Sequence, residues 1–357
     1  MANGPRSSLL AGDRCGWRAG RTILPAVVAF ALALAGSARA AQAPTYRSAA
    51  YPVGGAASAI GYGDYNGDGI PDLIVALPAD NAVVLMAGRA DGTFAPPSAP
   101  IPVGQDPVAV TSCVPGPYLG LLTRRSLSAD FNSDGKCDLA VADAGSTDIA
   151  VLIGNGDGTF KPATFIPVSG SPGAIVATQG TSSASSNPGA IAFLEPAENR
   201  LAVLRSRGDG TFYPEAAITV GADPVALVVG GANFAVADAG ARDVRAIADF
   251  AIQAPFGHSE ALTTEATWTL SSTPQALAAG SFGAAGLLAV TDSAGNLTLL
   301  GDTLGAHGTL VPTESAPIPV GPDPIAISPL RLPPASSYAD DLAIVNGGAH
   351  QLTLLRQ

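Results

Sequence analysis

Short apolar runs alternate with turn-forming residues along most of the chain. Leu73–Ala76 and Leu139–Ala142 are examples, and Gly, Pro, Asp and Asn cluster between such runs. Apolar runs of this length, bounded by turn residues, are typical of β-strands, whereas a helix would need a longer run with a period near 3.6. The pattern therefore predicts an all-β fold.

One segment recurs at a nearly constant spacing. Pro102–Val110 reads PVGQDPVAV, and similar segments run from Val220 to Leu227 and from Val320 to Ile327. Weaker copies surround Pro172 and Pro274, and Ala57 takes the proline position in the first copy. The anchor positions are 57, 107, 172, 224, 274 and 324. The longest gap contains an insertion from Cys113 to Ser126, so the underlying period is close to 50 residues.

A second marker follows the same period. Asp-Gly-Thr-Phe begins at Asp91, Asp157 and Asp209, and a degraded copy occurs at Gly308–Leu310. Asp-Gly between β-rich segments is a hairpin signal, so we interpret these aspartates as turn formers and not as metal ligands. Each unit then contains four short strands, which is the pattern of a propeller blade. Six anchors favour a six-bladed β-propeller of four-stranded antiparallel blades over a seven-bladed one. The last unit lacks its fourth strand, and residues 46–53 are expected to supply it by pairing with 351–356.

Two nine-residue loops carry the candidate chemistry. Both read D-x-N-x-D-G-x-x-D and lead into an apolar strand. Asp and Asn at alternate positions of a tight loop can direct oxygens to one centre, and oxygen is the donor that calcium prefers. An EF-hand would need Glu at the twelfth position, where Val75 and Val141 stand. The alternative is a polar turn without metal. The expected ligands of two calcium ions are Asp64, Asn66, Asp68, Asp72 and the Ile70 carbonyl, and Asp130, Asn132, Asp134, Asp138 and the Lys136 carbonyl.

These loops, the strand after each, and the Gly-x-Gly-Asp-Gly-Thr-Phe hairpin together resemble the FG-GAP/VCBS repeats of integrin α-chain-like propellers. The similarity is strongest over Ala129–Phe160 and next strongest over 59–94. Units three to six keep the strand pattern and lose the acidic loop. The resemblance implies calcium on one face of the propeller and a role in adhesion, recognition or carbohydrate-active machinery.

The first 40 residues have the features of a secretory signal peptide. Four arginines precede an apolar run from Ile23 to Gly36, and Ala38-Arg39-Ala40 provides a cleavage site. We therefore expect a signal peptide at 1–40 and one propeller domain at 41–357. Without residues 1–40 the chain keeps 13 basic and 28 acidic residues, a net charge of −15. Such acidity argues against nucleic acid or an anionic membrane as partner.

Two cysteines remain after cleavage, Cys113 and Cys137. An oxidising compartment permits a disulfide between them, and two buried thiols are the alternative.

The remaining sequence offers no catalytic motif. His258, His307 and His350 each stand alone, and no nucleophile elbow, P-loop or zincin motif occurs. Polar residues after the second strand of each unit, such as Asp143 and Glu195, either form an acidic rim or cap their own turns. Arg207-Gly208-Asp209 overlaps a hairpin turn, which explains its occurrence.

The sequence therefore predicts a secreted protein, extracellular or periplasmic, that inserts in no membrane after cleavage. We expect a calcium-binding propeller that binds another protein or a cell-surface polymer and is not an enzyme. The alternative is a lectin or a non-catalytic part of polysaccharide-processing machinery.

Overall fold

The computed structural model describes residues 50–113, 127–178, 189–230, 233–249, 262–280, 288–304, 310–330, 341–347 and 351–355. The expected signal peptide, the three histidines and residues 114–126 of the insertion lie outside these residues. The chain divides into two units, Met1–Ala50 and Tyr51–Gln357. All the described strands belong to the second unit. No helix in the part of the chain that the structure describes is long and apolar enough to span a membrane.

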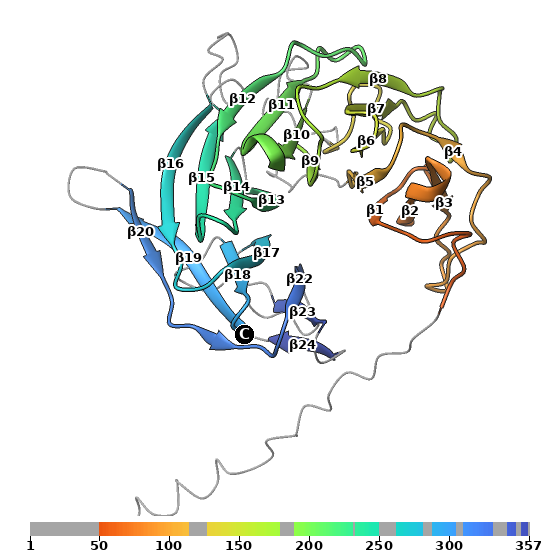
Figure 1. The fold of residues 1–357 in the computed structure, drawn as a ribbon. Coiled ribbons are helices and arrows are strands. Elements are labelled where there is room, and N and C mark those ends of the chain that lie inside the picture. The colour runs from red at the N-terminus through yellow and green to blue at the C-terminus, as the bar shows by residue number, and fades with distance from the viewer. Residues whose placement is uncertain are drawn as a thin grey trace, which may run out of the picture. The chain divides into compact units, whose positions relative to one another are not determined.

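The second unit is a β-propeller of six antiparallel sheets, which follow one another in chain order (Figure 1). Blade 1 comprises β1 (Ala59–Gly63), β2 (Asp72–Leu77), β3 (Ala82–Met86) and β4 (Ile101–Pro102). Blade 2 comprises β5 (Pro107–Val110), β6 (Leu139–Asp143), β7 (Asp148–Leu152) and β8 (Thr164–Pro167). Blade 3 comprises β9 (Ile175–Ala177), β10 (Ala190–Glu195), β11 (Arg200–Arg205) and β12 (Ala216–Thr219).

The second half repeats this order. Blade 4 comprises β13 (Pro224–Gly230), β14 (Asn233–Asp238), β15 (Asp243–Asp249) and β16 (Leu262–Thr269). Blade 5 comprises β17 (Pro274–Ala279), β18 (Leu288–Asp292), β19 (Asn296–Leu304) and β20 (Leu310–Glu314), with β21 (Ile318–Pro319) as an extra partner of β19. Blade 6 has three described strands, β22 (Pro324–Leu330), β23 (Asp341–Asn346) and β24 (Gln351–Leu355). The six-bladed prediction is confirmed.

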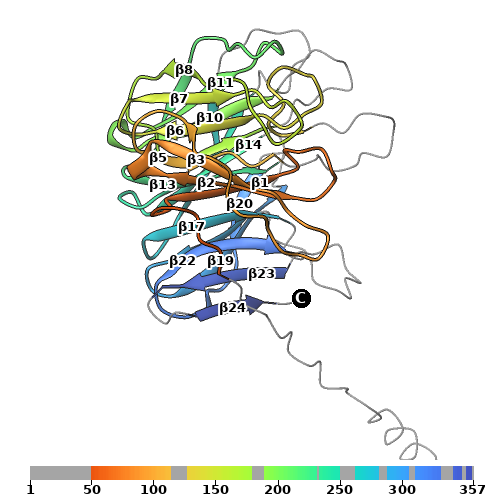
Figure 2. The ribbon, with the colours of Figure 1, turned by 90° about the vertical axis from the view of Figure 1, so that its right-hand side faces the viewer.

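The innermost strands stand side by side. Contacts join β1 to β5, β5 to β9, β9 to β13, β13 to β17 and β17 to β22, and the sheets form successive layers in the side view (Figure 2). Four of these strands begin at the predicted proline anchors, Pro107, Pro224, Pro274 and Pro324. The core is distributed between the blades, because four of the five buried clusters among the described residues contain side chains of neighbouring sheets.

The residue before the anchor proline fixes the entry into three of these strands. Asp106, Asp223 and Asp323 have φ values of 53°, 56° and 52°, a left-handed conformation that Asp tolerates better than most residues. The Asp106 N–H donates to Asn81 Oδ1 in blade 1 at 3.1 Å, and the Asp223 N–H donates to Asn199 Oδ1 in blade 3 at 2.9 Å. The anchor therefore ties each of these two turns to the preceding blade.

The predicted closure by residues 46–53 is not observed. Among the described residues β24 pairs only with β23, and residues 50–53 lie outside any strand. Tyr51 and Val53 instead pack against an apolar cluster of blade 1. Val84 and Met86 belong to this cluster, and burying their apolar side chains against Tyr51 and Val53 stabilises the observed position of the segment.

Candidate functional site: two acidic loops

The first acidic loop connects β1 to β2. The carboxylate of Asp64 accepts hydrogen bonds from the N–H groups of Gly67 at 2.8 Å and Gly69 at 2.9 Å. Asn66 Oδ1 accepts from the Asp68 N–H at 2.9 Å, and Asp68 Oδ1 accepts from the Ile70 N–H at 2.8 Å. The loop side chains therefore turn inward along the tight bend that the alternate polar positions predict.

The second loop, which leads into β6, repeats this arrangement. Asp130 accepts from the N–H groups of Asp134 at 3.1 Å and Gly135 at 3.0 Å. Asn132 Oδ1 also accepts from the Asp134 N–H, at 3.1 Å, and Asp134 Oδ1 accepts from the Lys136 N–H at 2.9 Å. Two copies of one sequence pattern thus adopt one conformation in consecutive blades.

The ninth residue of each loop is buried and has a separate role. Asp72 accepts from the N–H groups of Tyr65 at 2.9 Å and Gly88 at 2.9 Å, and both Asp72 and Asp138 are 0 % exposed. Asp138 likewise accepts from Phe131 at 2.7 Å and Gly154 at 2.9 Å. Burial raises the pKa of Asp138 to about 7, and the nearby acids of its loop add to the rise.

Gly88 and Gly154 are functional positions that the sequence interpretation missed. A Cβ on Gly88 would overlap the Pro71 carbonyl, and one on Gly154 would overlap the Cys137 carbonyl. Glycine there lets the chain after β3 or β7 approach the loop closely enough for its N–H to bind the ninth aspartate. The signal was present in the sequence, because the two blades with acidic loops both begin their hairpin motif with Gly, whereas blade 3 has Ser206 there.

The donor chemistry of both loops fits a hard cation. Carboxylate and carboxamide oxygens are the ligands that calcium prefers, and each ionised carboxylate has lone pairs beyond those used by one N–H donor. No group of three or more His, Cys, Asp or Glu side chains within the described residues is gathered in a metal-binding arrangement. The loop oxygens bind backbone N–H groups instead. The structure thus brings the predicted residues of each loop together as one tight bend.

The Asp-Gly-Thr-Phe aspartates are turn formers, as predicted. Asp91 Oδ1 accepts from both the N–H and the hydroxyl of Thr93, at 2.9 and 2.6 Å. Asp157 and Asp209 make the same pair of bonds to Thr159 and Thr211. These hydrogen bonds lower the pKa of all three exposed carboxyl groups.

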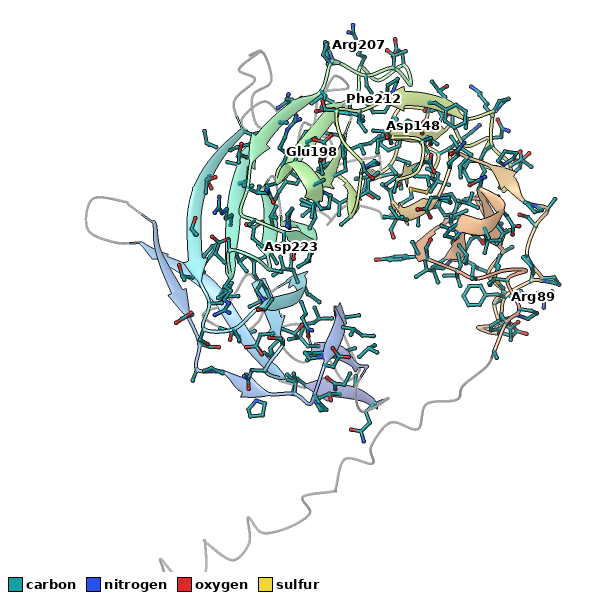
Figure 3. All side chains as sticks on the ribbon, in the orientation of Figure 1. Arg89, Asp148, Glu198, Arg207, Phe212 and Asp223 are labelled. Carbon is teal, nitrogen blue, oxygen red and sulfur yellow. A yellow bond between two sulfur atoms is a disulfide. The ribbon has the colours of Figure 1, made fainter. Side chains whose placement is uncertain are left out.

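The Arg-Gly-Asp tripeptide is part of the third of these turns. Arg207 lies 4.3 Å above the Tyr213 ring and donates from Nε to the Phe212 carbonyl at 3.2 Å. Figure 3 shows Arg207 and Phe212 at the outer rim of the sheets. Both charged ends of the tripeptide are therefore engaged by the turn itself.

An aromatic staple joins each acidic loop to the hairpin of the next blade. The Tyr65 carbonyl accepts from Gly158 at 3.0 Å, and the Tyr65 and Phe160 ring centroids are 5.7 Å apart. The Phe131 carbonyl accepts from Gly210 at 3.1 Å, and the Phe131 and Phe212 centroids are 5.5 Å apart. The second residue of each loop, which the metal interpretation passes over, thus holds neighbouring blades together.

A disulfide connects the two loop regions. Cys113 and Cys137 are bridged, with 5.7 Å between their Cα atoms, which confirms the disulfide over the two-thiol alternative. The Cys113 N–H also donates to the Tyr62 carbonyl at 2.8 Å, beside the start of the first loop. Since Cys137 lies inside the second loop, the bridge links that loop to the edge of blade 1.

The acids that end the second strand of blades 2, 3 and 4 do not form an exposed acidic rim. Asp143, Glu195 and Asp238 are fully buried. Asp143 Oδ2 accepts from the Gly104 N–H at 3.0 Å, and Glu195 Oε1 accepts from the Gly170 N–H at 2.6 Å. They therefore hold the Val-Gly turn, or its equivalent, that leads into their own blade. A Cβ on Gly104 would lie 2.6 Å from Asp143 Oδ2, which explains the glycine.

Asp143 provides a test by pH. Burial, helped by the charge of Asp148, raises the pKa of Asp143 to about 7, above the value of about 3.9 expected in the unfolded chain. The folded state then binds this proton more tightly between about pH 4 and 7, so the free energy of unfolding falls as pH rises through that window. Asp143→Asn keeps an acceptor for Gly104 and cannot ionise. It is expected to be more stable than the parent at pH 8, by at most about 4 kcal/mol.

Urea unfolding of both proteins at pH 5 and pH 8 measures this difference. Asp80→Asn, which removes an exposed acid of blade 1, is the matched control for the change in net charge. An identical pH dependence of Asp143→Asn and the parent would show that Asp143 is ionised in the folded protein.

A family model supports the repeat assignment. The model described as FG-GAP-like repeat matches residues 64–116 and 130–180, and both matches begin at the first aspartate of an acidic loop. The resemblance seen in the sequence is thereby confirmed for blades 1 and 2. No curated protein matches the chain.

Solved structures support the architecture. A putative 6-phosphogluconolactonase from Bacteroides uniformis is 15% identical, with 87% of this chain and 83% of that chain covered and a TM-score of 0.57. A protein from Lactobacillus plantarum is 14% identical over 84% of both chains, with a TM-score of 0.52. The periplasmic gluconolactonase of Pseudomonas aeruginosa is 16% identical, with 82% of this chain and 71% of that chain covered and a TM-score of 0.50.

Identities this low carry the fold and not the activity. The two acidic loops, the aromatic staples and the two segments that the family model matches all indicate the same repeat unit. The chain is a six-bladed β-propeller whose first two blades carry FG-GAP-like repeats.

Proposed function

We propose that this protein is a secreted, calcium-binding β-propeller that recognises a protein or a surface polymer. The observation that carries the binding role is an apolar surface beside the first loop. Ile60 and Tyr62 on β1 are 64% and 52% exposed, although large apolar side chains are usually covered when they lie together. Partially exposed aromatic and aliphatic side chains of this kind anchor protein interfaces.

Calcium is proposed for its structural effect on the two loops. Asp64, Asn66, Asp68, Asp72 and the Ile70 carbonyl would hold one ion. The second ion would be held by Asp130, Asn132, Asp134, Asp138 and the Lys136 carbonyl. A bound cation would supply positive charge among these clustered oxygens and relieve the repulsion between them. The support is the donor set and its repetition in two successive blades.

Secretion is proposed from the residues before the propeller. The arginine-rich start, the apolar run and the Ala-x-Ala site at 38–40 are the parts of a signal peptide. The Cys113–Cys137 disulfide suits the oxidising environment outside the cytoplasm.

Removal of calcium is expected to lower the melting temperature of the protein purified with calcium. A ligand at a hundredfold excess over its Kd stabilises the folded state by about 2.7 kcal/mol per site. Asp68→Ala and Asp134→Ala should each halve the calcium bound at equilibrium dialysis, and the double variant should melt at one temperature with and without chelator. Asp91→Ala removes an exposed aspartate of the same blade that belongs to a turn, and should keep both ions. Fewer than two ions on the parent protein would refute the proposal.

The binding role is tested with the residues 41–357 protein against a glycan array and against extracellular proteins of its source, each with calcium and with chelator. A specific protein partner should be lost on Tyr62→Ser, with the melting temperature unchanged. Binding of the same glycan by the parent and by Tyr62→Ser would favour the lectin alternative. Turnover of gluconolactone or 6-phosphogluconolactone would refute a purely binding role.

A further inference from the structure

Blade 3 contains an ion-paired triad, with one buried acid, at one end of its sheet. Arg200, the first residue of β11, lies 3.3 Å from Glu195 Oε2 and 2.8 Å from Glu215 Oε1. Glu195 ends β10 and is fully buried, and Glu215 immediately precedes β12. The Arg200 guanidinium group therefore pairs with the acid that ends β10 and with the acid just before β12.

In blade 4 an arginine also pairs with two acids, but it occupies a different position in the sheet. Arg245 on β15 lies 3.3 Å from Asp238 Oδ2 and 3.0 Å from Asp243 Oδ2. Asp238 ends β14, as Glu195 ends β10, and Arg245 is paired across the sheet with Val236. In blades 3 and 4, the buried acid that ends the second strand therefore forms an ion pair with an arginine of the same blade.

Blade 5 keeps the acids and lacks the arginine. Asp292 ends β18, and Asn296 begins β19 where Arg200 begins β11. Thr298 is paired with Val290, so it takes the place of Arg245. Glu314 is paired with Leu300, which puts it at the position of Glu215. Two acids of the triad are retained, and two short polar residues replace the basic ones.

A pocket opens where the guanidinium groups lie in the other blades. Its volume is about 270 Å³, and its walls include Asp292, Glu314, Thr298, Val290, Leu270 and Ser315. Thr269, Ser271 and Pro317 complete the lining, so the pocket combines two carboxyl groups and four hydroxyl groups with the apolar side chains of Val290, Leu270 and Pro317. In blades 3 and 4 the corresponding place holds a cationic side chain of the same sheet, Arg200 or Arg245.

The hydrogen bonds of Asp292 do not include a cation. Oδ1 accepts from the N–H groups of Ala294 and Asn296, both at 3.0 Å, and Oδ2 accepts from the Ser272 hydroxyl. The ion pairs of Arg200 and Arg245 include neither Asp292 nor Glu314. Asp292 is 7% exposed, so its carboxyl group is largely withdrawn from water.

We propose that the blade 5 pocket binds the guanidinium group of an arginine side chain presented by a protein partner. The planar fork of a guanidinium group can bind two carboxylates at once, as Arg200 does in blade 3. Its aliphatic stem would lie along Val290 and Leu270. The protein source of this arginine rests on the proposed function; the pocket's preference for a guanidinium group does not.

The test is isothermal titration with N-acetyl-arginine amide and with N-acetyl-citrulline amide, its uncharged analogue of nearly the same shape. Arginine amide is expected to bind with one-to-one stoichiometry, and citrulline amide to bind at least tenfold more weakly. Glu314→Gln should weaken arginine binding on the order of tenfold, because it removes a charged hydrogen-bond acceptor. Asp80→Asn, an equal change of charge on blade 1, should leave it unchanged.

Two further variants fill the pocket from within. Thr298→Arg reproduces the position of Arg245, and Asn296→Arg reproduces that of Arg200. Each variant that retains the parent circular dichroism spectrum should lose arginine binding, and the second remains informative if the first does not fold. Unchanged binding by a folded variant, equal binding of citrulline amide, or no binding of arginine amide would overturn the proposal.

All titrations are repeated with chelator and with free arginine. The pocket lies in blade 5, outside the acidic loops of blades 1 and 2, so its affinity should be the same without calcium. A failed calcium experiment therefore leaves this result intact. Tighter binding of free arginine than of the capped residue would overturn the protein source, because the preferred ligand would then be the free amino acid, whose α-ammonium and α-carboxylate groups an arginine within a protein chain lacks.

Discussion

Phe131→Ala is expected to lower the free energy of unfolding by about 3–5 kcal/mol, the usual cost of removing a buried aromatic side chain. Phe131 is fully buried, and its ring centroid lies 5.5 Å from that of Phe212 in the next blade. The substitution leaves a cavity in the staple between blades 2 and 3. Urea unfolding followed by far-ultraviolet circular dichroism measures the loss.

A double-mutant cycle with Phe212→Ala isolates the contact between the blades. The double variant is expected to lose about 0.5–1.5 kcal/mol less than the sum of the two single losses, which is the coupling energy usual for aromatic pairs. Phe165→Ala serves as control, because Phe165 on β8 is 49% exposed and should cost far less. A loss below 1 kcal/mol for Phe131→Ala would mean that the blades pack independently of this ring.

Loss of the disulfide is expected to destabilise the protein by about 3 kcal/mol, since closing a loop of this size restricts the unfolded chain. Cys113 and Cys137 are 24 positions apart, and both side chains are buried. The double variant Cys113→Ala, Cys137→Ala should therefore unfold at a lower urea concentration than the oxidised parent. The reduced parent is the second reference, because it retains both sulfur atoms.

The reduced parent separates the cross-link from the packing of the sulfurs. It should be less stable than the oxidised protein and more stable than the double alanine variant, whose smaller side chains leave a cavity. Oxidised and reduced proteins of equal stability would show that the bridge does not restrict the unfolded state as the chain-entropy model requires.

The sequence was sufficient for every feature that depends on local pattern. The proline anchors begin the inner strands, Asp91 and its equivalents form turns, and both acidic loops bend as their spacing predicts. Such features need only residues that are close in the chain, because hydrogen bonds to nearby N–H groups determine them. The count of six blades follows from the same periodicity.

Contacts between blades could not be inferred in this way. Tyr65 and Phe160 meet across a blade boundary, and nothing local in either segment names its partner. The predicted pairing of 46–53 with 351–356 was wrong for the described residues 50–53 for a related reason. The sequence shows that Tyr51 and Val53 are apolar, and only the packing shows that blade 1 covers them. The sequence also left two places open for the buried acids, because it does not distinguish an Asp143 exposed at a rim from an Asp143 buried against a turn.

The direction of the aromatic staples bears on the order in which the chain acquires its structure. Each acidic loop completes its packing with a hairpin that is synthesised one blade later, as Gly158 is for Tyr65 and Gly210 for Phe131. A chain that emerges from its N-terminus would therefore finish each loop only after the following blade has appeared. Tyr51 makes a 5.6 Å edge contact with Phe94 in blade 1, so the first hairpin meets an aromatic ring that has already emerged. The first blade can thus begin the series without waiting for the last.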